Sequence, residues 1–401
     1  MSTLSDVACW ILAIAAVFLA VMVGVFALQV FAGAWGHNRE RARATPSHAR
    51  RRIAVLVPAH DEESGIALTV ATAIQQLHPD DCVLVVADNC TDNTAAVARQ
   101  AGARVVERFH ETERGKGFAL AFGVAALRAD PPGLVVVLDA DCQLAPGSLD
   151  ALADCVVRTN RPAQALNLML APPDASLPRR MAQFAWRVRN WVRPEGWHRL
   201  GLACQLMGTG MAFTWPMVRE APLANASIVE DMKLGIDLAI GGQAPILCLD
   251  ALVTSRFPDS AAATKSQRAR WEHGHLEMIL REVPHMLMAA LRNRDARLAS
   301  MAFDLCVPPL ALLAALLLLG QGLAIGLALW TDNLAIAVTY GVLLGLFGAS
   351  ALVAWISRGT DLVRLPELLS IPFYIAAKLP LYLLFLVRRQ KQWVRTSRDK
   401  P

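Results

Sequence analysis

Three stretches of the sequence are long and apolar enough to cross a lipid bilayer, and they constrain the fold more than any other feature. They are Val7–Phe31, Leu305–Trp330 and Leu334–Ile356, and a helix needs roughly 20 residues to span the hydrocarbon core. The polar turn Thr331-Asp332-Asn333 separates the last two, which predicts a transmembrane hairpin. A hydrophobic content of 55% is too high for an ordinary soluble protein and indicates a membrane protein.

Positive charge beside these stretches predicts the orientation of the chain, because Lys and Arg near a span collect on the cytoplasmic side. The relevant residues are Arg39, Arg41, Arg43, Arg50, Arg51 and Arg52 after the first stretch, Arg292, Arg294 and Arg297 before the hairpin, and Arg358 and Arg364 after it. We therefore expect a multi-pass protein of the cell (inner or plasma) membrane. Its expected parts are an anchor at 1–35, a basic linker at 36–52, a cytosolic domain at 53–285 and a hairpin at 301–358.

The last part, residues 359–401, allows two interpretations. Its apolar stretch Leu368–Val387 contains Pro372, Lys378 and Pro380 and leads into a basic tail. A fourth transmembrane helix would place this tail outside, whereas a re-entrant or interfacial helix would keep it in the cytoplasm. The charge rule favours the helix that does not cross.

The segment Leu177–Trp197 has apolar residues at helical spacing and five arginines nearby. This pattern is typical of a helix that lies on a membrane surface. It is equally typical of an amphipathic helix that packs on its own domain.

Between Ile53 and about Arg281, short apolar runs alternate with helical stretches. Near-continuous runs of Val, Ile and Leu that are too short for helices predict buried parallel strands, here Ile53–Val57, Val83–Val86, Arg104–Val106 and Val135–Leu138. The stretches between them, Gly65–Gln76, Thr94–Ala101 and Lys116–Leu127, predict crossover helices. The expected fold is a Rossmann-like α/β domain with a mostly parallel sheet, whose ligands bind at the carboxyl ends of the strands.

Asp139 and Asp141 directly follow one of these strands. Because alternate residues of an extended strand project to the same side, both carboxylates can face one site while Ala140 points away. Two hard oxygen groups aimed together suit Mg²⁺ or Mn²⁺ that bridges the phosphates of a nucleotide. A lone D-x-D is weak evidence, but its place after a buried strand favours this metal site.

Composition excludes other chemistry. The eight cysteines are scattered and form no C-x-x-C pair, so they predict neither a zinc site nor a disulfide framework. The net charge of +5 is modest, and the arginines cluster beside apolar runs instead of on a face with aromatic residues. We therefore expect no nucleic acid partner.

Six ordered motifs carry a resemblance that covers about residues 53–281. They are Val57-Pro58-Ala59-His60-Asp61-Glu62-Glu63, the segment Val86–Thr94, Arg114-Gly115-Lys116-Gly117, Asp139-Ala140-Asp141, Glu230-Asp231 and Gln267-Arg268-Ala269-Arg270-Trp271. Together they resemble the membrane-bound family 2 glycosyltransferases of GT-A fold, in particular the Q-x-x-R-W branch. This branch includes cellulose, hyaluronan and poly-N-acetylglucosamine synthases and ceramide glucosyltransferases.

The resemblance implies which residues bind the donor. Pro58 and Glu62 at the first strand end, with Asp88 after the second, would hold the uracil and ribose. Lys116 would meet the nucleotide, while Asp139 and Asp141 would contact the ribose-diphosphate and the metal.

It also implies the groups on the acceptor side. Asp231, with Glu230 beside it, would be the general base that takes the proton of the acceptor hydroxyl, so that one displacement inverts the anomer. Arg270 would meet a phosphate with its planar fork, and Trp271 would stack on a sugar ring. The full set near the acceptor and diphosphate is Gly210, Gln267, Arg268, Arg270 and Trp271.

The implied activity is metal-dependent inverting transfer of a hexose or N-acetylhexosamine from a nucleotide-diphospho-sugar, which we expect to be a UDP-sugar. The acceptor would be a saccharide, a growing exopolysaccharide at the membrane, with accessory or homo-oligomeric subunits because this chain has few spans. The alternative is transfer of one sugar to a lipid acceptor, ceramide glucosyltransferase-like or polyprenyl-linked. A remote alternative is an inactive nucleotide-binding scaffold or transport subunit, against which the intact Asp139, Asp141 and Asp231 argue.

Overall fold

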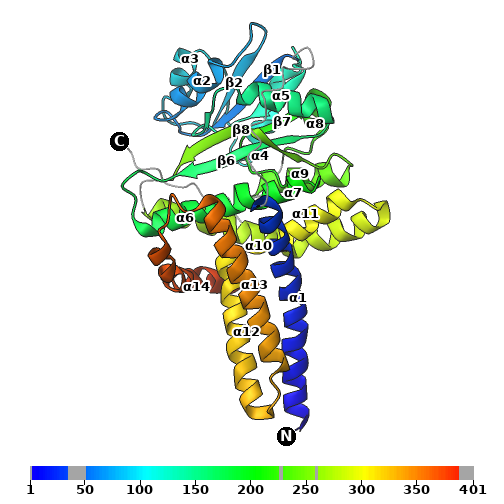
Figure 1. Ribbon diagram of the computed structural model, residues 1–401. Coiled ribbons are helices and arrows are strands. Elements are labelled where there is room, and N and C mark those ends of the chain that lie inside the picture. Colours follow the sequence, from blue (N-terminus) through cyan, green and yellow to red (C-terminus); the bar gives the residue numbers. More distant parts are fainter. Residues whose placement is uncertain (1, 35–50, 225–228, 258–260, 388–401) are drawn as a thin grey trace.

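The computed structural model describes residues 2–34, 51–224, 229–257 and 261–387 of the 401-residue chain. Figure 1 shows an α/β domain above a bundle of long helices, with the N-terminus at the far end of the bundle. The expected Rossmann-like, mostly parallel α/β domain is confirmed, and long apolar helices stand at both ends of it.

The sheet has eight strands in the order β3-β2-β1-β4-β7-β6-β8-β5. Their bounds are β1 Ile53–Ala59, β2 Cys82–Asp88, β3 Arg104–Arg108, β4 Leu134–Val137, β5 Gln143–Leu144, β6 Ala163–Leu170, β7 Met211–Thr214 and β8 Ile246–Arg256. Strands β1 to β4 are parallel to one another, as are β6 and β8. The pairs that include β7 and β5 are antiparallel.

Helices cover both faces of this sheet. Along β1, Ile53, Val55 and Val57 belong to one buried core and Ala54 and Leu56 to the other. The first core packs under α2 (Ile66–Ile74), α3 (Thr94–Gln100) and α5 (Ser148–Thr159), and the second under α4 (Lys116–Leu127), α8 (Trp215–Glu220) and α9 (Glu230–Ile240). Burial on both sides is why these strands are continuous apolar runs.

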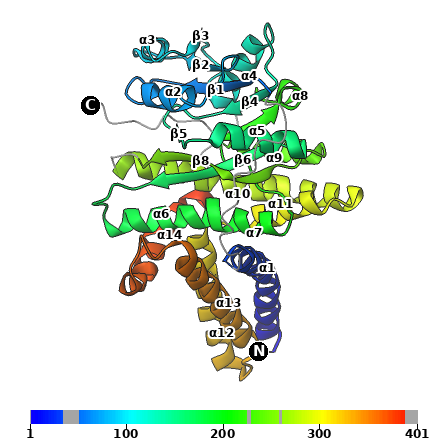
Figure 2. The ribbon, with the colours of Figure 1, turned by 45° about the horizontal axis from the view of Figure 1, so that its top comes forward.

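Among the described residues, four helices are long and apolar enough to cross a membrane. Three of them, α1 (Ser2–Ala34), α12 (Leu310–Thr331) and α13 (Ala335–Arg358), run side by side below the domain in Figures 1 and 2. The apolar stretch expected from Leu305 is divided, because Leu305 belongs to a separate helix, α11 (Ala296–Cys306). Pro308 and Pro309 follow it, and two residues without a backbone N–H cannot continue a helix.

The amphipathic segment at 177–197 forms α6 (Leu177–Arg187), a π-helical turn η1 (Val188–Val192) and α7 (Arg193–Arg199). These lie between the sheet and the bundle (Figure 1). Its apolar residues Met181, Phe184 and Val188 share one core with Val23 and Phe26 of α1. The apolar face of this segment therefore packs on the upper ends of the long helices.

A polar network joins α1 to this layer. Gln29 of α1 donates from Nε2 to Asp304 Oδ1 (2.6 Å) and accepts from Nε of Arg193 (2.8 Å). Arg193 also forms a buried ion pair with Asp304 at 2.8 Å. Each of these polar groups is bonded to another, so no unpaired charge of this network is buried beside the apolar helix.

The two remaining helical segments complete the chain. A 33-residue helix, α10 (Ala261–Asn293), leads from the domain to α11. After a 3-10 turn η2 (Leu365–Ser370), α14 (Ile371–Val387) runs across the upper end of the bundle in Figure 1 instead of along it. Lys378 of α14 forms an ion pair with Glu272 of α10 at 2.6 Å.

Close packing of α1 on α7 predicts a sensitive glycine. A Cβ atom on Gly196 would lie 1.9 Å from the carbonyl oxygen of Gln29, whereas a Cβ on Gly24 of α1 would meet nothing within 4 Å. We expect Gly196→Ala to push the helices apart and lower the free energy of unfolding by about 1–3 kcal/mol. Thermal unfolding in detergent checks this against Gly24→Ala, which should stay within about 0.5 kcal/mol of the wild type. Equal melting temperatures for the two variants would contradict the packing.

Candidate active site

The turn after β4 places two carboxylates at the carboxyl edge of the sheet. The backbone N–H of Cys142 donates to the carbonyl of Asp139 (3.1 Å), which closes a tight turn, and Ala140 is buried in the core beneath. Carboxylate oxygens of Asp139 and Asp141 lie within 4.8 Å of each other. Burial and the charge of Asp139 raise the pKa of Asp141 to about 6. This donor pair fits Mg²⁺ or Mn²⁺, because such an ion would offset the repulsion between the two acids.

Lys116, the first residue of α4, lies at the centre of the acidic groups. Its Nζ is 2.5 Å from Asp139 Oδ1, 3.8 Å from Glu230 Oε1, and donates to the carbonyl of Gly208 at 2.8 Å. Burial acts to lower the pKa of Lys116, but Asp139, Glu230 and Asp231 outweigh it and raise this pKa. The lysine is therefore held as a cation among three carboxylates.

Glu230 and Asp231 begin helix α9, where acidic side chains are favourable next to the helix N-terminus. A Cβ atom on Gly208 would lie 3.2 Å from Asp231 Oδ2, 3.5 Å from Lys116 Nζ and 3.9 Å from Asp139 Oδ2. The three charged groups thus meet around a residue without a side chain. Burial raises the pKa of Glu230 to about 7 despite Lys116, and burial also raises the pKa of Asp231.

The ends of β1 and β2 form the next part of the site. Asp88 Oδ1 accepts from Arg108 Nη1 (2.7 Å) and from Asn89 Nδ2 (3.1 Å). Both bonds reach one carboxylate oxygen, so Oδ2 remains for a ligand. The backbone N–H of Glu62 donates to the Thr94 hydroxyl (2.7 Å), which ties the loop after β1 to helix α3.

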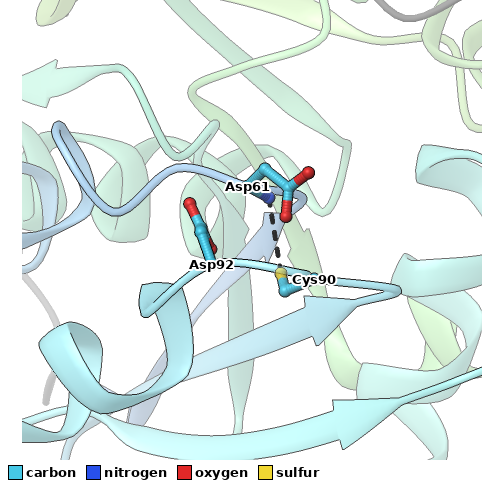
Figure 3. A group of neighbouring side chains, drawn as sticks. All are labelled: Asp61, Cys90 and Asp92. Carbon is cyan, nitrogen blue, oxygen red and sulfur yellow. Dashed lines mark hydrogen bonds between the residues drawn. The ribbon is translucent and has the colours of Figure 1, made fainter. Parts of the chain in front are cut away.

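A second group of possible metal ligands, Asp61, Cys90 and Asp92, lies beside these loops (Figure 3). The Asp61 backbone N–H donates to Cys90 Sγ (3.4 Å), and Asp61 Oδ1 accepts from the Thr91 N–H (2.6 Å). Asp92 Oδ1 accepts from the Thr94 N–H (2.9 Å). The Asp92 bond is a local side-chain to backbone contact that stabilises a turn. The two Asp61 bonds tie the loop after β1 to the loop after β2, so we assign the group to loop structure.

Most of the candidate residues line one cavity of about 810 Å³. It brings together Pro58, Glu62, Asp88, Lys116, Asp139, Asp141, Glu230, Asp231, Arg270 and Trp271. Gly210 does not line it, because a Cβ there would meet Ala165 and Val253 inside the sheet at 2.8 Å. Gly208 occupies the cavity wall instead. The side chains of Gln267 and Arg268 lie outside the described residues.

Arg270 and Trp271 stand on α10, with the Trp271 ring centroid 5.0 Å from that of Trp186. Burial lowers the pKa of Arg270, and the charges of Glu230 and Asp139 act in the opposite direction. The guanidinium of Arg270 therefore interacts electrostatically with the carboxylates after β4 and at the start of α9.

The cavity is also lined by Gly208 and His275, and by four residues that sequence patterns did not assign to the site. These four are Asn167, Arg189, Trp197 and Gln205. His275 Nε2 contacts the Leu305 carbonyl (3.1 Å), and burial together with Arg189 and Arg193 lowers the pKa of His275 to about 3. No local signal marks these residues, because they come from segments far apart in the sequence.

Comparison with known proteins identifies relatives. A family model described as "Glycosyltransferase like family 2" matches residues 49–274, more than half of the chain. The mannosyltransferase PcManGT from Pyrobaculum calidifontis, solved with GDP-Man and Mn²⁺, is 17% identical with a TM-score of 0.50, over 86% of this chain and 99% of that chain. This likeness shows the fold.

A second solved structure matches part of the chain. Glucosyl-3-phosphoglycerate synthase from Mycobacterium tuberculosis, in complex with Mg²⁺ and uridine diphosphate, is 21% identical with a TM-score of 0.37, over 56% of this chain and 79% of that chain. No curated protein sequence gives a significant match.

The raised pKa of Glu230 predicts a pH-dependent stability. Its pKa is about 7 in the folded protein against an ordinary 4.5. Between these values the folded state binds more protons than the unfolded state, so stability falls as pH rises. We expect Glu230→Gln to gain on the order of 1–3 kcal/mol above pH 7 and nothing below pH 4.5. Thermal unfolding in EDTA across this range measures the gain, with exposed Glu220→Gln as control. A gain that is the same at every pH would refute the assignment.

Proposed function

The chain belongs to the glycosyltransferase-like family 2, and from this premise we propose that it is a metal-dependent inverting glycosyltransferase. It moves a hexose or N-acetylhexosamine from a nucleotide-diphospho-sugar, which we take to be a UDP-sugar, to a growing polysaccharide at a membrane. One observation carries the proposal: Asp139, Lys116 and Asp231 converge on Gly208 within a single cavity.

The donor lies along the carboxyl ends of β1, β2 and β4. Asp88 accepts a ribose hydroxyl through Oδ2, while Pro58 and Glu62 border the base. Asp139 and Asp141 would hold Mg²⁺ or Mn²⁺, which would supply positive charge to the departing diphosphate. Arg270 pairs with a phosphate oxygen through its planar fork. PcManGT, solved with GDP-Man and Mn²⁺, supports a nucleotide sugar and this ion for the fold.

The acceptor approaches from the side of α9. Asp231 takes the proton of the acceptor hydroxyl as its oxygen attacks the anomeric carbon. Burial raises the pKa of this carboxyl, which brings the base closer to the pH at which it works. The positive charge of Lys116 offsets the repulsion between the surrounding carboxylates and the diphosphate of the donor. Trp271 offers the face of its ring to the acceptor sugar.

A second candidate acceptor is a lipid that receives one sugar. The cavity extends past Arg189 and Trp197 to Asp304 and Leu305, at the upper end of the long apolar helices. A lipid head group could therefore reach the site from the bilayer. The product separates the two acceptors, because a polymer gives a ladder of masses and a lipid head gives one mass step.

We propose that the catalytic domain is cytoplasmic and that α14 lies along the same membrane surface. The ion pair between Lys378 and Glu272 and the orientation of α14 in Figure 1 support this arrangement. A protease-sensitive tag at the C-terminus should then be cleaved only in inverted vesicles. A tag at the N-terminus should be cleaved only in right-side-out vesicles. Cleavage of both tags from the same side would contradict the topology.

The base and the metal ligands are separable by mutation. We expect Asp231→Asn to lower sugar transfer by about 10²–10⁴-fold, the range for a lost general base, while UDP still binds in the presence of Mn²⁺. Asp141→Asn should weaken UDP binding itself, because a metal ligand is lost. The measurement is UDP release from a panel of UDP-sugars by purified protein. Asp237→Asn, on the same helix but paired with Lys233, is the control. Unchanged UDP release by Asp231→Asn would exclude the mechanism.

A further inference from the structure

The part of the cavity wall around Arg189, which we call the inner end, carries a positive charge that the proposed chemistry does not use. Arg189 lies on the π-helical turn η1 and lines the cavity beside Asn190 and Arg193. Pro194 follows η1 and has no N–H to donate to the carbonyl of Asn190, which favours the wider turn. This turn places Arg189 next to the site, and π-helical turns are frequent at functional sites.

Arg189 has no hydrogen-bond or ion-pair partner among the described residues. The neighbouring charges are matched elsewhere: Arg193 pairs with Asp304 at 2.8 Å, and Glu272 pairs with Lys378 at 2.6 Å. Burial lowers the pKa of Arg189, with the charge of Asp231 acting against this. Arg189 is partly buried, and a partly buried guanidinium without a hydrogen-bonded partner is unfavourable, so a ligand anion is its natural complement.

Three uncharged polar groups that line the cavity also lack partners among the described residues. Asn167 Oδ1, Trp197 Nε1 and Gln205 Oε1 are buried with no hydrogen bond, and all three residues line the cavity. They offer one donor and two acceptors. Buried polar atoms without partners are rare in proteins and mark places that a ligand or water fills.

The position of Arg189 separates it from the diphosphate of the donor. Arg270 interacts electrostatically with Glu230 and with Asp139, one of the two proposed metal ligands. Arg189 instead interacts with Asp231, Arg193, Glu272 and Asp304, and it lowers the pKa of His275. Val188 and Val192 of the same turn pack in one core with Val23 and Phe26 of α1, so Arg189 lies between Asp231 and the upper end of the apolar helices.

We propose that the inner end of the cavity is an acceptor subsite that selects a phosphate-bearing acceptor, with the phosphate bound by Arg189. The inference rests on the proposed function and names its acceptor class. The reacting hydroxyl lies beside Asp231, and the phosphate lies on the inner side of that hydroxyl. Planar guanidinium forks bind phosphate oxygens in pairs, which fixes position as well as charge.

The transfer step balances without another reactant. The acceptor hydroxyl oxygen forms a bond to the anomeric carbon of the donor sugar. The bond from that carbon to the diphosphate oxygen breaks, and its electron pair leaves with the nucleotide. The hydroxyl proton goes to Asp231, while the phosphate on Arg189 keeps its charge throughout.

The phosphate could belong to a soluble sugar phosphate or to a lipid head group, and matched acceptors distinguish these sources. Glucose 1-phosphate against methyl glucoside tests the soluble source in phosphatidylcholine nanodiscs. Nanodiscs that contain phosphatidylinositol against ones that contain diacylglycerol test the lipid source. UDP release should be faster with the phosphate-bearing member of at least one pair.

The variants test Arg189 itself. We expect Arg189→Met to raise the KM for the phosphate-bearing acceptor by about 10- to 100-fold, as for a lost charge-assisted hydrogen bond, with little change in kcat. Arg189→Lys should recover part of the loss. Arg187→Met, on the preceding turn and paired with Asp361, should resemble the wild type. Equal KM values for Arg189→Met and the wild type would overturn the proposal, as would equal use of neutral and phosphate-bearing acceptors.

A binding measurement decides the matter if none of these acceptors is used. With UDP and Mn²⁺ saturating, inorganic phosphate should raise the melting temperature of the wild type and of Arg187→Met but not that of Arg189→Met. No shift in the wild type would overturn the acceptor subsite. If UDP with Mn²⁺ stabilises none of the proteins, the proposed transferase function itself has failed, which is a separate result.

Discussion

The ammonium group of Lys116 is the interaction on which the site depends. Asp139, Glu230 and Asp231 come from two segments almost a hundred residues apart, and repulsion would separate these carboxylates without a cation between them. Lys116 also donates to the Gly208 carbonyl, which fixes the loop that leads into β7. One side chain thus joins α4, the turn after β4, the Gly208 loop and the start of α9.

This arrangement is incomplete by itself. Two carboxylates at the end of β4 and two at the start of α9 surround one lysine, and burial keeps the pKa values of Asp141 and Glu230 near neutrality. The excess of negative charge suits a divalent cation, which in turn suits a diphosphate. In the proposed mechanism Arg270 would bind the diphosphate of the donor and Arg189 the phosphate of the acceptor.

The layer of α6, η1 and α7 connects this chemistry to the apolar helices. Gln29 of α1, Arg193 of α7 and Asp304 of α11 form one bonded network below the cavity. Gly196 lets α7 approach the backbone of α1. The floor of the site and the top of the bundle are consequently the same surface, which is why an acceptor from the bilayer would have a short path to Asp231.

The sequence predicted the part of the fold that rests on local patterns. The first four strands and the helix Lys116–Leu127 follow directly from runs of apolar residues, and the carboxylates at the strand ends lie together because parallel strands end at one edge. The bond from Arg108 to Asp88, the division at Leu305 and the place of Arg189 were missed. Each depends on contacts between distant segments or on a turn geometry that hydrophobic periodicity does not encode.

The central claim is that the acids after β4 bind a nucleotide diphosphate through a divalent ion. Isothermal titration of UDP into the purified full-length protein tests it most directly, once with Mn²⁺ and once with EDTA. The account predicts saturable binding with Mn²⁺ that disappears in EDTA. Equal affinity in both conditions, or no binding in either, would contradict it.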